Sequence, residues 1–144
     1  MTTVAAILKH KGYEITAVDP TARIAHVAEV LSERRIGAVL VLDRAEQLLG
    51  IVSERDIVRS LAANGARTLE MTAGQLMTRA IQVAQPQTTV PQAMAMMTAG
   101  RFRHLPVEDH GELVGLISIG DVVKWRVQEM EQESAALRDY IQSA

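Results

Sequence analysis

The sequence contains no cysteine and few aromatic residues, with one Phe, one Trp and two Tyr among 144 residues. Without cysteine the chain forms no disulfide and offers no thiolate as a nucleophile or metal ligand. It also lacks an apolar run near the ~20 residues that a membrane-spanning helix needs, and its first residues lack the apolar core and cleavage site of a signal peptide. We therefore expect a cytoplasmic protein with no membrane partner.

Neither sign of charge dominates the chain. Its 15 basic and 17 acidic residues give a net charge of −2, so no excess of positive charge is present to neutralise a nucleic-acid backbone. A composition of 48% hydrophobic and 22% charged residues is typical of a soluble domain that can bury a core. We do not expect nucleic acid as a partner.

Common catalytic and metal-binding motifs are also missing. The sequence has no G-x-x-x-x-G-K, no G-x-G-x-x-G, no H-E-x-x-H and no nucleophile elbow. Its four histidines are scattered and show no metal-ligand spacing. We therefore expect no catalytic residues and no required metal, and the chain is not predicted to be an enzyme.

What the sequence does contain is an internal repeat. Residues 48–59 (LLGIVSERDIVR) match residues 113–124 (LVGLISIGDVVK) at a step of 65 residues. Upstream the step is 66, as for Val41 and Val107, and the extra residue falls in the polar stretch after Asp43. An insertion in a turn is what a duplicated fold tolerates.

Each copy changes its periodicity in the same order. In the first copy a short strand (15–18) precedes an amphipathic helix from Ile24, two strands (38–42 and 49–53) and a helix from Glu54, whose inner face we assign to Ile57, Val58 and Leu61. The predicted fold class is α+β, with two β-α-β-β-α repeats packed as a pseudo-two-fold pair and a C-terminal amphipathic helix. The predicted divisions are an N-terminal helical segment (1–12), repeat 1 (13–66), a polar linker (67–75), repeat 2 (76–126) and the C-terminal helix (127–144).

The pattern G-h-h-S-x-x-D, where h is apolar, ends both copies and resembles the tandem cystathionine-β-synthase (CBS) domain pair. The strings GIVSERDIV, RFRHLPVED and GLISIGDVV carry the resemblance, which runs from about Ile15 to about Arg126. It implies a stand-alone regulatory module that binds an adenine nucleotide without chemistry. AMP is favoured, with NAD(H), ADP or ATP as alternatives. It also implies a homodimer and a separate effector protein of unknown identity. The competing interpretation is a purely structural dimerisation module with vestigial clefts.

Two Ser-x-x-Asp segments are the first candidate site residues. Ser53 and Ser118 fall where a strand runs into a helix, so a hydroxyl and unpaired N–H groups can face a phosphate. Asp56 and Asp121 follow one turn later, and a carboxylate, which only accepts hydrogen bonds, suits the hydroxyls of a ribose. The alternative is a capping box, in which serine and aspartate only satisfy the helix start.

Arg103 is the candidate for contact with phosphate, because the resemblance places a basic residue in this slot and a guanidinium pairs well with phosphate oxygens. Glycine occupies the equivalent position, 37, so the two clefts need not be equal. Arg55 is a weaker candidate for the other cleft, and His104 either donates to a phosphate or packs beside Pro106. The alternative for Arg103 is an ordinary solvated charge.

The resemblance also implies where adenine binds. The base would lie against the first strand of each copy and the opening of the middle strand, at Thr16, Thr78, Ile81, Gly37, Ala38 and Val39. Small residues let the base approach the backbone closely. Plain strand packing is the alternative. Because the family's clefts are composite, Ser118 and Asp121 would share a ligand with Gly37 and Ala38.

The tail repeats apolar residues at steps of four and three, interrupted only by Ser134. The stripe consists of Val123, Val127, Met130, Leu137 and Ile141. This heptad spacing predicts a helix that packs on a twin helix in a homodimer. The alternative is that the stripe folds back on its own domain.

Overall fold

The computed structural model describes residues 2–79 and 82–143, which form two compact units. The first-repeat unit is Glu14–Ile81, and the second-repeat unit combines Met1–Tyr13 with Gln82–Ala144. The segment before the first repeat thus belongs to the unit built by the second repeat.

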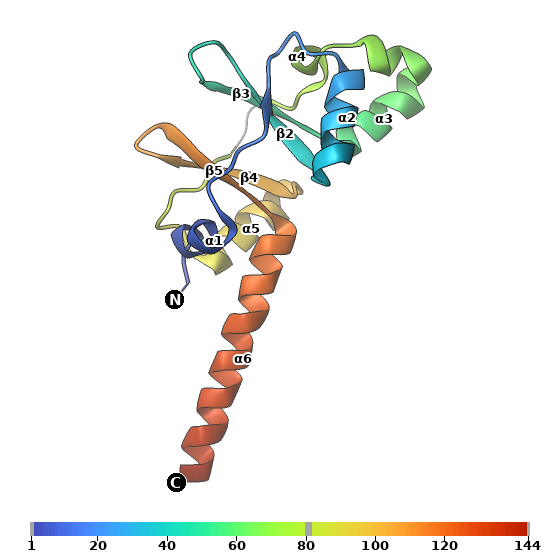
Figure 1. The fold of residues 1–144 in the computed structure, drawn as a ribbon. Helices are drawn as coiled ribbons and strands as arrows, with labels where there is room; N and C mark the ends of the chain where they lie inside the picture. Colours follow the sequence, from blue (N-terminus) through green and yellow to red (C-terminus); the bar gives the residue numbers. More distant parts are fainter. Residues whose placement is uncertain (1, 80–81, 144) are drawn as a thin grey trace. The chain divides into compact units, whose positions relative to one another are not determined.

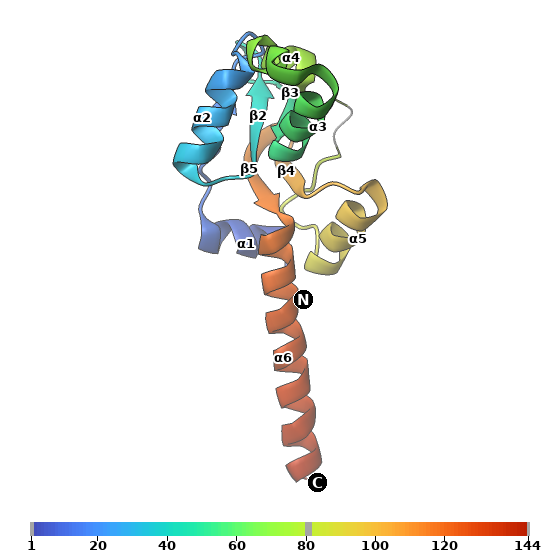
Figure 2. The same cartoon turned by 90° about the vertical axis from the view of Figure 1, so that its right-hand side faces the viewer.

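The first-repeat unit has a three-stranded sheet in the order β1-β2-β3, with β1 parallel and β3 antiparallel to β2. Its elements are β1 (Ala17–Val18), α2 (Ile24–Arg34), β2 (Ala38–Leu42), β3 (Leu48–Ser53), α3 (Glu54–Asn64), the 3₁₀ helix η1 (Gly65–Glu70) and α4 (Ala73–Leu76). In Figures 1 and 2, α2 and α3 cover one face of the sheet. There Val39, Val41 and Val52 pack on the apolar faces of the two helices.

The predicted elements of this repeat are confirmed, with two corrections. Val58 and Leu61 do not lie on the inner face of α3, because they are 63% and 39% exposed, whereas Ile57 is buried. Only one side of α3 packs on the sheet, and the side chains of Val58 and Leu61 lie outside this packed side. The stretch expected to be a polar joint contains η1 and α4, and within it Thr68 is fully buried, where its hydroxyl lies 2.8 Å from that of Ser60.

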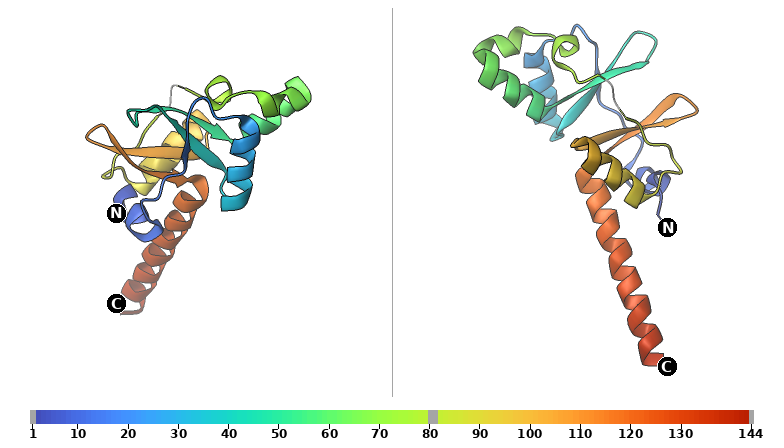
Figure 3. Two further views of the ribbon diagram at one scale, coloured as in Figure 1. Left: turned by 45° about the horizontal axis from the view of Figure 1, so that its top comes forward. Right: turned by 180° about the vertical axis from the view of Figure 1, so that it is seen from behind.

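The second-repeat unit pairs β4 antiparallel with β5 and buries one apolar core. Its elements are α1 (Val4–Lys11), α5 (Val90–Gly100), β4 (His104–Asp109), β5 (Glu112–Ser118) and α6 (Ile119–Ser143). Figure 3 shows α1, α5 and the start of α6 gathered against this strand pair. Side chains from all five elements form the core, among them Ile7, Met97, Leu105, Ile117 and Val122.

Equivalent contacts recur at the 66-residue step. Val18 pairs in parallel with Val41, and Ala84 forms a parallel bridge with Val107. A register shift follows Val41 in one strand pair and Val107 in the other. These matched contacts confirm the duplication, and they assign the place of the first strand in the second copy to Ala84.

The sequence-based placement of Thr78 in that first strand is wrong. Thr78 bridges Ile51 of β3, with Thr78 N donating to Ile51 O at 2.9 Å and Ile51 N donating to Thr78 O at 3.1 Å. Gly50 permits this approach, because a Cβ there would lie 2.7 Å from the Thr78 carbonyl oxygen and 2.6 Å from Met77 Sδ. Ile81 lies outside the described residues.

The same glycine of the second copy faces α1. A Cβ on Gly115 would lie 2.6 Å from Cδ2 of Leu8. In each unit the glycine of the G-h-h-S-x-x-D pattern therefore packs against a segment from just before the other repeat. Gly50 of the first repeat contacts Met77 and Thr78, which precede the second repeat, and Gly115 of the second repeat contacts Leu8, which precedes the first. This symmetry explains why α1 packs with the second repeat.

The long helix α6 runs away from β4 and β5 of its own unit (Figure 1). Its buried residues are Val122 and Glu129, and every side chain from Met130 to Ser143 is exposed. The helix itself is confirmed over 25 residues. Over residues 2–79 and 82–143, no helix combines the length and apolar character that crossing a membrane requires.

Candidate functional site

The first Ser-x-x-Asp segment forms a complete capping box at the start of α3. Ser53 Oγ accepts a hydrogen bond from Asp56 N at 3.2 Å, and Asp56 Oδ2 accepts from Ser53 N at 2.8 Å. The serine hydroxyl also donates to Asp56 Oδ2 at 3.0 Å. The capping interpretation of this segment is therefore correct.

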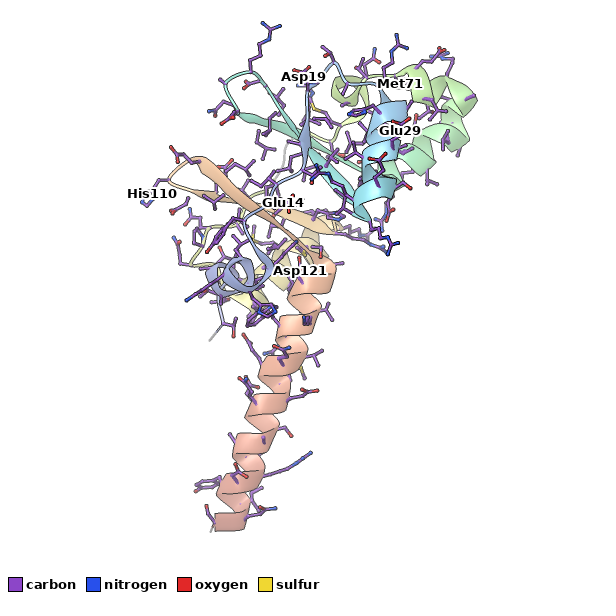
Figure 4. All side chains as sticks on the ribbon, viewed as in Figure 1. Glu14, Asp19, Glu29, Met71, His110 and Asp121 are labelled. Carbon is purple, nitrogen blue, oxygen red and sulfur yellow. The ribbon has the colours of Figure 1, made fainter. Side chains whose placement is uncertain are left out.

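The second segment makes the same two backbone contacts where β5 meets α6. Asp121 N donates to Ser118 Oγ at 3.2 Å, and Ser118 N donates to Asp121 Oδ2 at 2.8 Å. Figure 4 shows Asp121 at this junction. Both copies thus hold their serine and aspartate in one fixed geometry.

Lys11 makes the second segment different from the first. Its ammonium, at the end of α1, lies 2.7 Å from Asp121 Oδ2 and donates to the carbonyl oxygen of Leu116 at 2.9 Å. Burial by itself would raise the pKa of Asp121, but the hydrogen bond and positive charge of Lys11, together with the Ser118 N–H, outweigh it and lower the pKa below the usual value of an aspartate. Asp121 is therefore held as a carboxylate.

Sequence reasoning missed Lys11. The residue belongs to a segment outside the recognised repeat pattern, and its partner Asp121 is 110 residues away. The packing of α1 on the second repeat, including Leu8 against Gly115 and His10 against Trp125, brings the end of α1 to this carboxylate. No local spacing in the sequence carries that information.

Most backbone N–H groups at the start of α3 already donate to acceptors within the protein. In the first-repeat unit Ser53 N and Asp56 N serve the capping box, and Glu54 N donates to Gly37 O at 2.9 Å. Since these N–H groups are already paired, the helix start alone is a poor phosphate site. A phosphate role for the two serines stays a prediction, and an anion here needs a nearby cation.

The two carboxylates keep acceptor capacity. Among the described residues, every hydrogen bond to Asp56 and Asp121 falls on Oδ2. Oδ1 of each carboxylate thus has lone pairs available, and a carboxylate oxygen accepts readily from a hydroxyl. Both edges can bind a diol while retaining their caps.

Arg103 occupies the slot that Gly37 occupies in the first copy. Ile119 N donates to Arg103 O at 2.8 Å, which matches the bond from Glu54 N to Gly37 O. The Arg103 side chain is exposed, and its backbone lies next to the start of α6, where Asp121 also lies. At this slot the second-repeat unit places the backbone of an arginine next to its Ser-x-x-Asp edge, whereas the matching residue of the first-repeat unit is glycine.

The other polar and proline candidates for the site, His104, Pro106 and Arg55, all belong to regular secondary structure. His104 pairs with Ser118 in the ladder of β4 and β5 and is half-buried. Pro106 is buried, and its carbonyl accepts from Ala84 N at 2.8 Å. Arg55 is half-buried on the first turn of α3, beside Asp56.

The residues expected to meet adenine divide into two kinds. Val39 is fully buried in the core under α2 and α3, so its side chain serves packing. Thr16 is half-buried with its carbonyl accepting from Leu40 N at 3.1 Å, and Gly37 and Ala38 open β2, where Ala38 pairs with Ser53. The small residues at this opening therefore adjoin the capping box of their own unit.

The site residues form two groups, one on each unit. The first-repeat unit brings together Thr16, Gly37, Ala38, Ser53, Arg55 and Asp56, with Thr78 at the edge of β3. The second-repeat unit contains Lys11, Arg103, His104, Pro106, Ser118 and Asp121, and of these Lys11 and Ser118 contact Asp121 directly. Among the described residues no group of three or more His, Cys, Asp or Glu is arranged to hold a metal ion.

Comparison with known proteins fits this geometry. The CBS domain-containing protein CBSX3, mitochondrial, of Arabidopsis thaliana is 32% identical over 151 residues, covering 98% of this chain and 72% of its own. The crystal structure of the CBS-domain containing protein ATU1752 from Agrobacterium tumefaciens is 44% identical, with a TM-score of 0.85 over 87% of this chain and 93% of that one. The CBS domain protein PAE2072 from Pyrobaculum aerophilum, solved in complex with AMP, is 30% identical, with a TM-score of 0.73 over 83% of this chain and 88% of that one.

The family model of the CBS domain matches twice, at residues 4–63 and 73–128. Each match includes one Ser-x-x-Asp segment and the strand pair that precedes it. The chain therefore belongs to the CBS domain family, as a tandem CBS pair.

Proposed function

We propose that this CBS pair is a non-catalytic regulatory module that binds an adenine nucleotide, with AMP favoured and NAD(H), ADP or ATP as alternatives. The observation that carries the proposal is the repeated Ser-x-x-Asp edge, in which each cap leaves carboxylate Oδ1 available for a hydroxyl. The AMP complex of the related PAE2072 protein supports an adenine ligand.

The proposed contacts follow from charge and hydrogen-bonding capacity. The ribose hydroxyls donate to the carboxylate of Asp121 or Asp56, which accepts hydrogen bonds and repels phosphate. The phosphate is bound by cations, with Arg103 as the leading candidate and Lys11 and Arg55 as further ones. In the first-repeat unit the base lies at the small residues Gly37 and Ala38, which open β2 beside the Ser53 and Asp56 edge.

The two sites differ in this proposal. Asp121 has Lys11 beside it and Arg103 in the adjoining slot, whereas Asp56 has neither. A phosphorylated ligand therefore prefers the Asp121 site, because the ammonium of Lys11 lies beside it and Arg103, whose backbone adjoins the start of α6, carries a second positive charge. Adenosine, which has no phosphate, discriminates less between the two.

Regulation requires that the ligand bind one conformation more tightly than another. In the proposed mechanism the ligand changes the relation of the two repeats or of two copies in a homodimer, and a separate effector protein responds. We propose the cytoplasm as the compartment. The competing function is a structural dimerisation module, which the self-satisfied caps and the exposed stripe of α6 favour.

Small molecules released by denaturing freshly purified protein, identified by mass spectrometry, separate these two functions. The nucleotide-binding function predicts a released adenine nucleotide, or a melting temperature that rises with added AMP because ligand stabilises the native state by mass action. No released nucleotide and no thermal shift with AMP, NAD(H), ADP or ATP at millimolar concentration would support the structural module instead.

A further inference from the structure

From Val123 to Ile141, α6 carries an apolar stripe that its own unit leaves exposed. Exposure along the stripe rises from 41% at Val123 and 47% at Val127 to 64% at Ile141. In proteins most helical stability comes from the packing of an amphipathic face, so a helix that leaves its apolar stripe in water forgoes that stabilisation. The stripe therefore indicates that α6 packs on a partner.

The contacts of α6 with its own unit use a different face. Val122 is buried in the core, the ring of Trp125 lies edge-on to His10 at 5.8 Å between centroids, and Glu129 Oε1 accepts from Thr2 N at 3.0 Å. At about 100° per residue this face lies about a third of a turn from the stripe. Packing of α6 on its own unit and pairing of the stripe are thus compatible.

The stripe has the composition of a two-stranded coiled coil. Its steps of four and three assign Val127, Ser134 and Ile141 to heptad position a, and Val123, Met130 and Leu137 to position d. β-branched residues at a with Leu at d favour two parallel strands, and Val127 and Ile141 at a with Leu137 at d fit this pattern. The single polar residue at a, Ser134, specifies register in such a pair, since it faces itself only when the strands are in register.

The flanking charges select the orientation. The charged residues at position g are Arg126 and Glu133, and those at position e are Lys124, Glu131 and Arg138. In a parallel pair each g residue faces the e residue five positions later in the second copy, so Arg126 meets Glu131 and Glu133 meets Arg138. In an antiparallel pair centred on the stripe, e residues face e residues of the second copy. Glu131 would then face Glu131 of the second copy, and Lys124 would face Arg138 of the second copy, so like charges would adjoin. Opposite charges adjoin in the parallel arrangement only.

We propose that α6 pairs with α6 of a second copy as a parallel, in-register, two-stranded coiled coil. The occupant of the stripe is a second copy of this chain, because the charges beside the stripe complement themselves. This deepens the homodimer of the proposed function and rests on that part of it alone. Nucleotide binding is tested separately.

Because the chain contains no cysteine, single introduced thiols test orientation directly. Val123→Cys and Ile141→Cys are both at exposed positions and lie at opposite ends of the stripe. On mild oxidation each variant alone should form a disulfide-linked dimer, since like positions adjoin in a parallel pair. In an antiparallel pair each position lies about 27 Å along the helix axis from the same position of the second copy, so only a mixture of the two variants would cross-link.

A charge exchange tests register with surface residues only. Glu133→Lys and Arg138→Glu each place like charges between g and e positions, so each alone should dimerise roughly 5- to 30-fold more weakly. An equal mixture should restore dimerisation, because in the mixed dimer the two altered side chains face each other with opposite charge, and the unaltered Glu133 faces the unaltered Arg138. Glu112→Lys, at an exposed position of β5, is the matched control and should leave dimerisation unchanged.

Light scattering of the full chain completes the test. The proposal predicts a dimer of the 15.7 kDa chain that Leu137→Asp converts to monomer. A dimer that survives Leu137→Asp and gives no cross-link through Val123→Cys or Ile141→Cys would overturn the coiled coil and leave the homodimer standing. A monomer at all accessible concentrations would overturn both, and cross-linking only in the mixture would overturn the parallel orientation.

Discussion

The ammonium of Lys11 lies 2.7 Å from Oδ2 of Asp121 and so ties the N-terminal helix to the start of α6. The same carboxylate oxygen accepts the Ser118 N–H that caps this helix. One group therefore contributes to packing, to helix capping and, in the proposed function, to ligand binding. The charge of the Asp121 carboxylate therefore affects both the stability of the second-repeat unit and, in the proposed function, the binding of ligand.

The ion pair should contribute modestly to stability. The side chains of Lys11 and Asp121 are 40% and 25% exposed, so solvent screens their attraction. A double-mutant cycle with Lys11→Met, Asp121→Asn and the combined variant should give a coupling of about 0.5–1 kcal/mol in the free energy of unfolding, measured by urea denaturation. Zero coupling would mean that the contact makes no contribution in solution.

Stability should depend on the charge of Asp121 in acid. Because folding lowers the pKa of Asp121, its contribution is fully present above the pKa of the unfolded chain and is lost as pH falls through the lower pKa of the folded state. The difference in unfolding free energy between wild type and Asp121→Asn should therefore shrink from about pH 6 to about pH 2.5. Asp109→Asn, at an exposed carboxyl on β4, serves as the control. A difference that stays constant over this range would contradict the lowered pKa.

The sequence predicts much of the fold, because the spacing of apolar residues changes from strand to helix in the same order in both repeats. The bounds of β2 and the start of α3 follow from the apolar run at 38–42 and from Ser53. The exposure of Val58 and the pairing of Thr78 with β3 do not, since they depend on which surfaces the tertiary structure covers. The Ser-x-x-Asp edges are recognisable from repetition, whereas Lys11 reaches Asp121 through the tertiary packing of α1 in the second-repeat unit.

The two equivalent glycines should differ in their tolerance of alanine. In Gly50→Ala the new methyl group would meet the Thr78 carbonyl oxygen of the backbone at 2.7 Å, whereas in Gly115→Ala it would meet the flexible end of Leu8 at 2.6 Å. We expect a loss of about 2–3 kcal/mol in unfolding free energy for Gly50→Ala and about 1 kcal/mol for Gly115→Ala, measured by chemical denaturation. The reverse order would show that the Leu8 side chain yields less than the Thr78 backbone.

The role of Arg103 in binding phosphate can be separated from general binding. Arg103→Gln should weaken AMP roughly 10-fold in titration calorimetry, because a charge-assisted hydrogen bond is lost, and should leave adenosine affinity unchanged. Arg101→Gln, at another exposed arginine two residues away, is the matched control. Equal losses for adenosine and AMP would remove Arg103 from the phosphate site.

Titration calorimetry of the full chain with AMP, repeated with GMP, tests the central claim most directly. The account predicts saturable heat with AMP and at least roughly tenfold weaker binding of GMP, because the two ligands share ribose and phosphate and differ only in the base. Absence of binding heat with AMP at millimolar concentration, with the melting temperature also unchanged, would contradict an adenine-nucleotide-binding module.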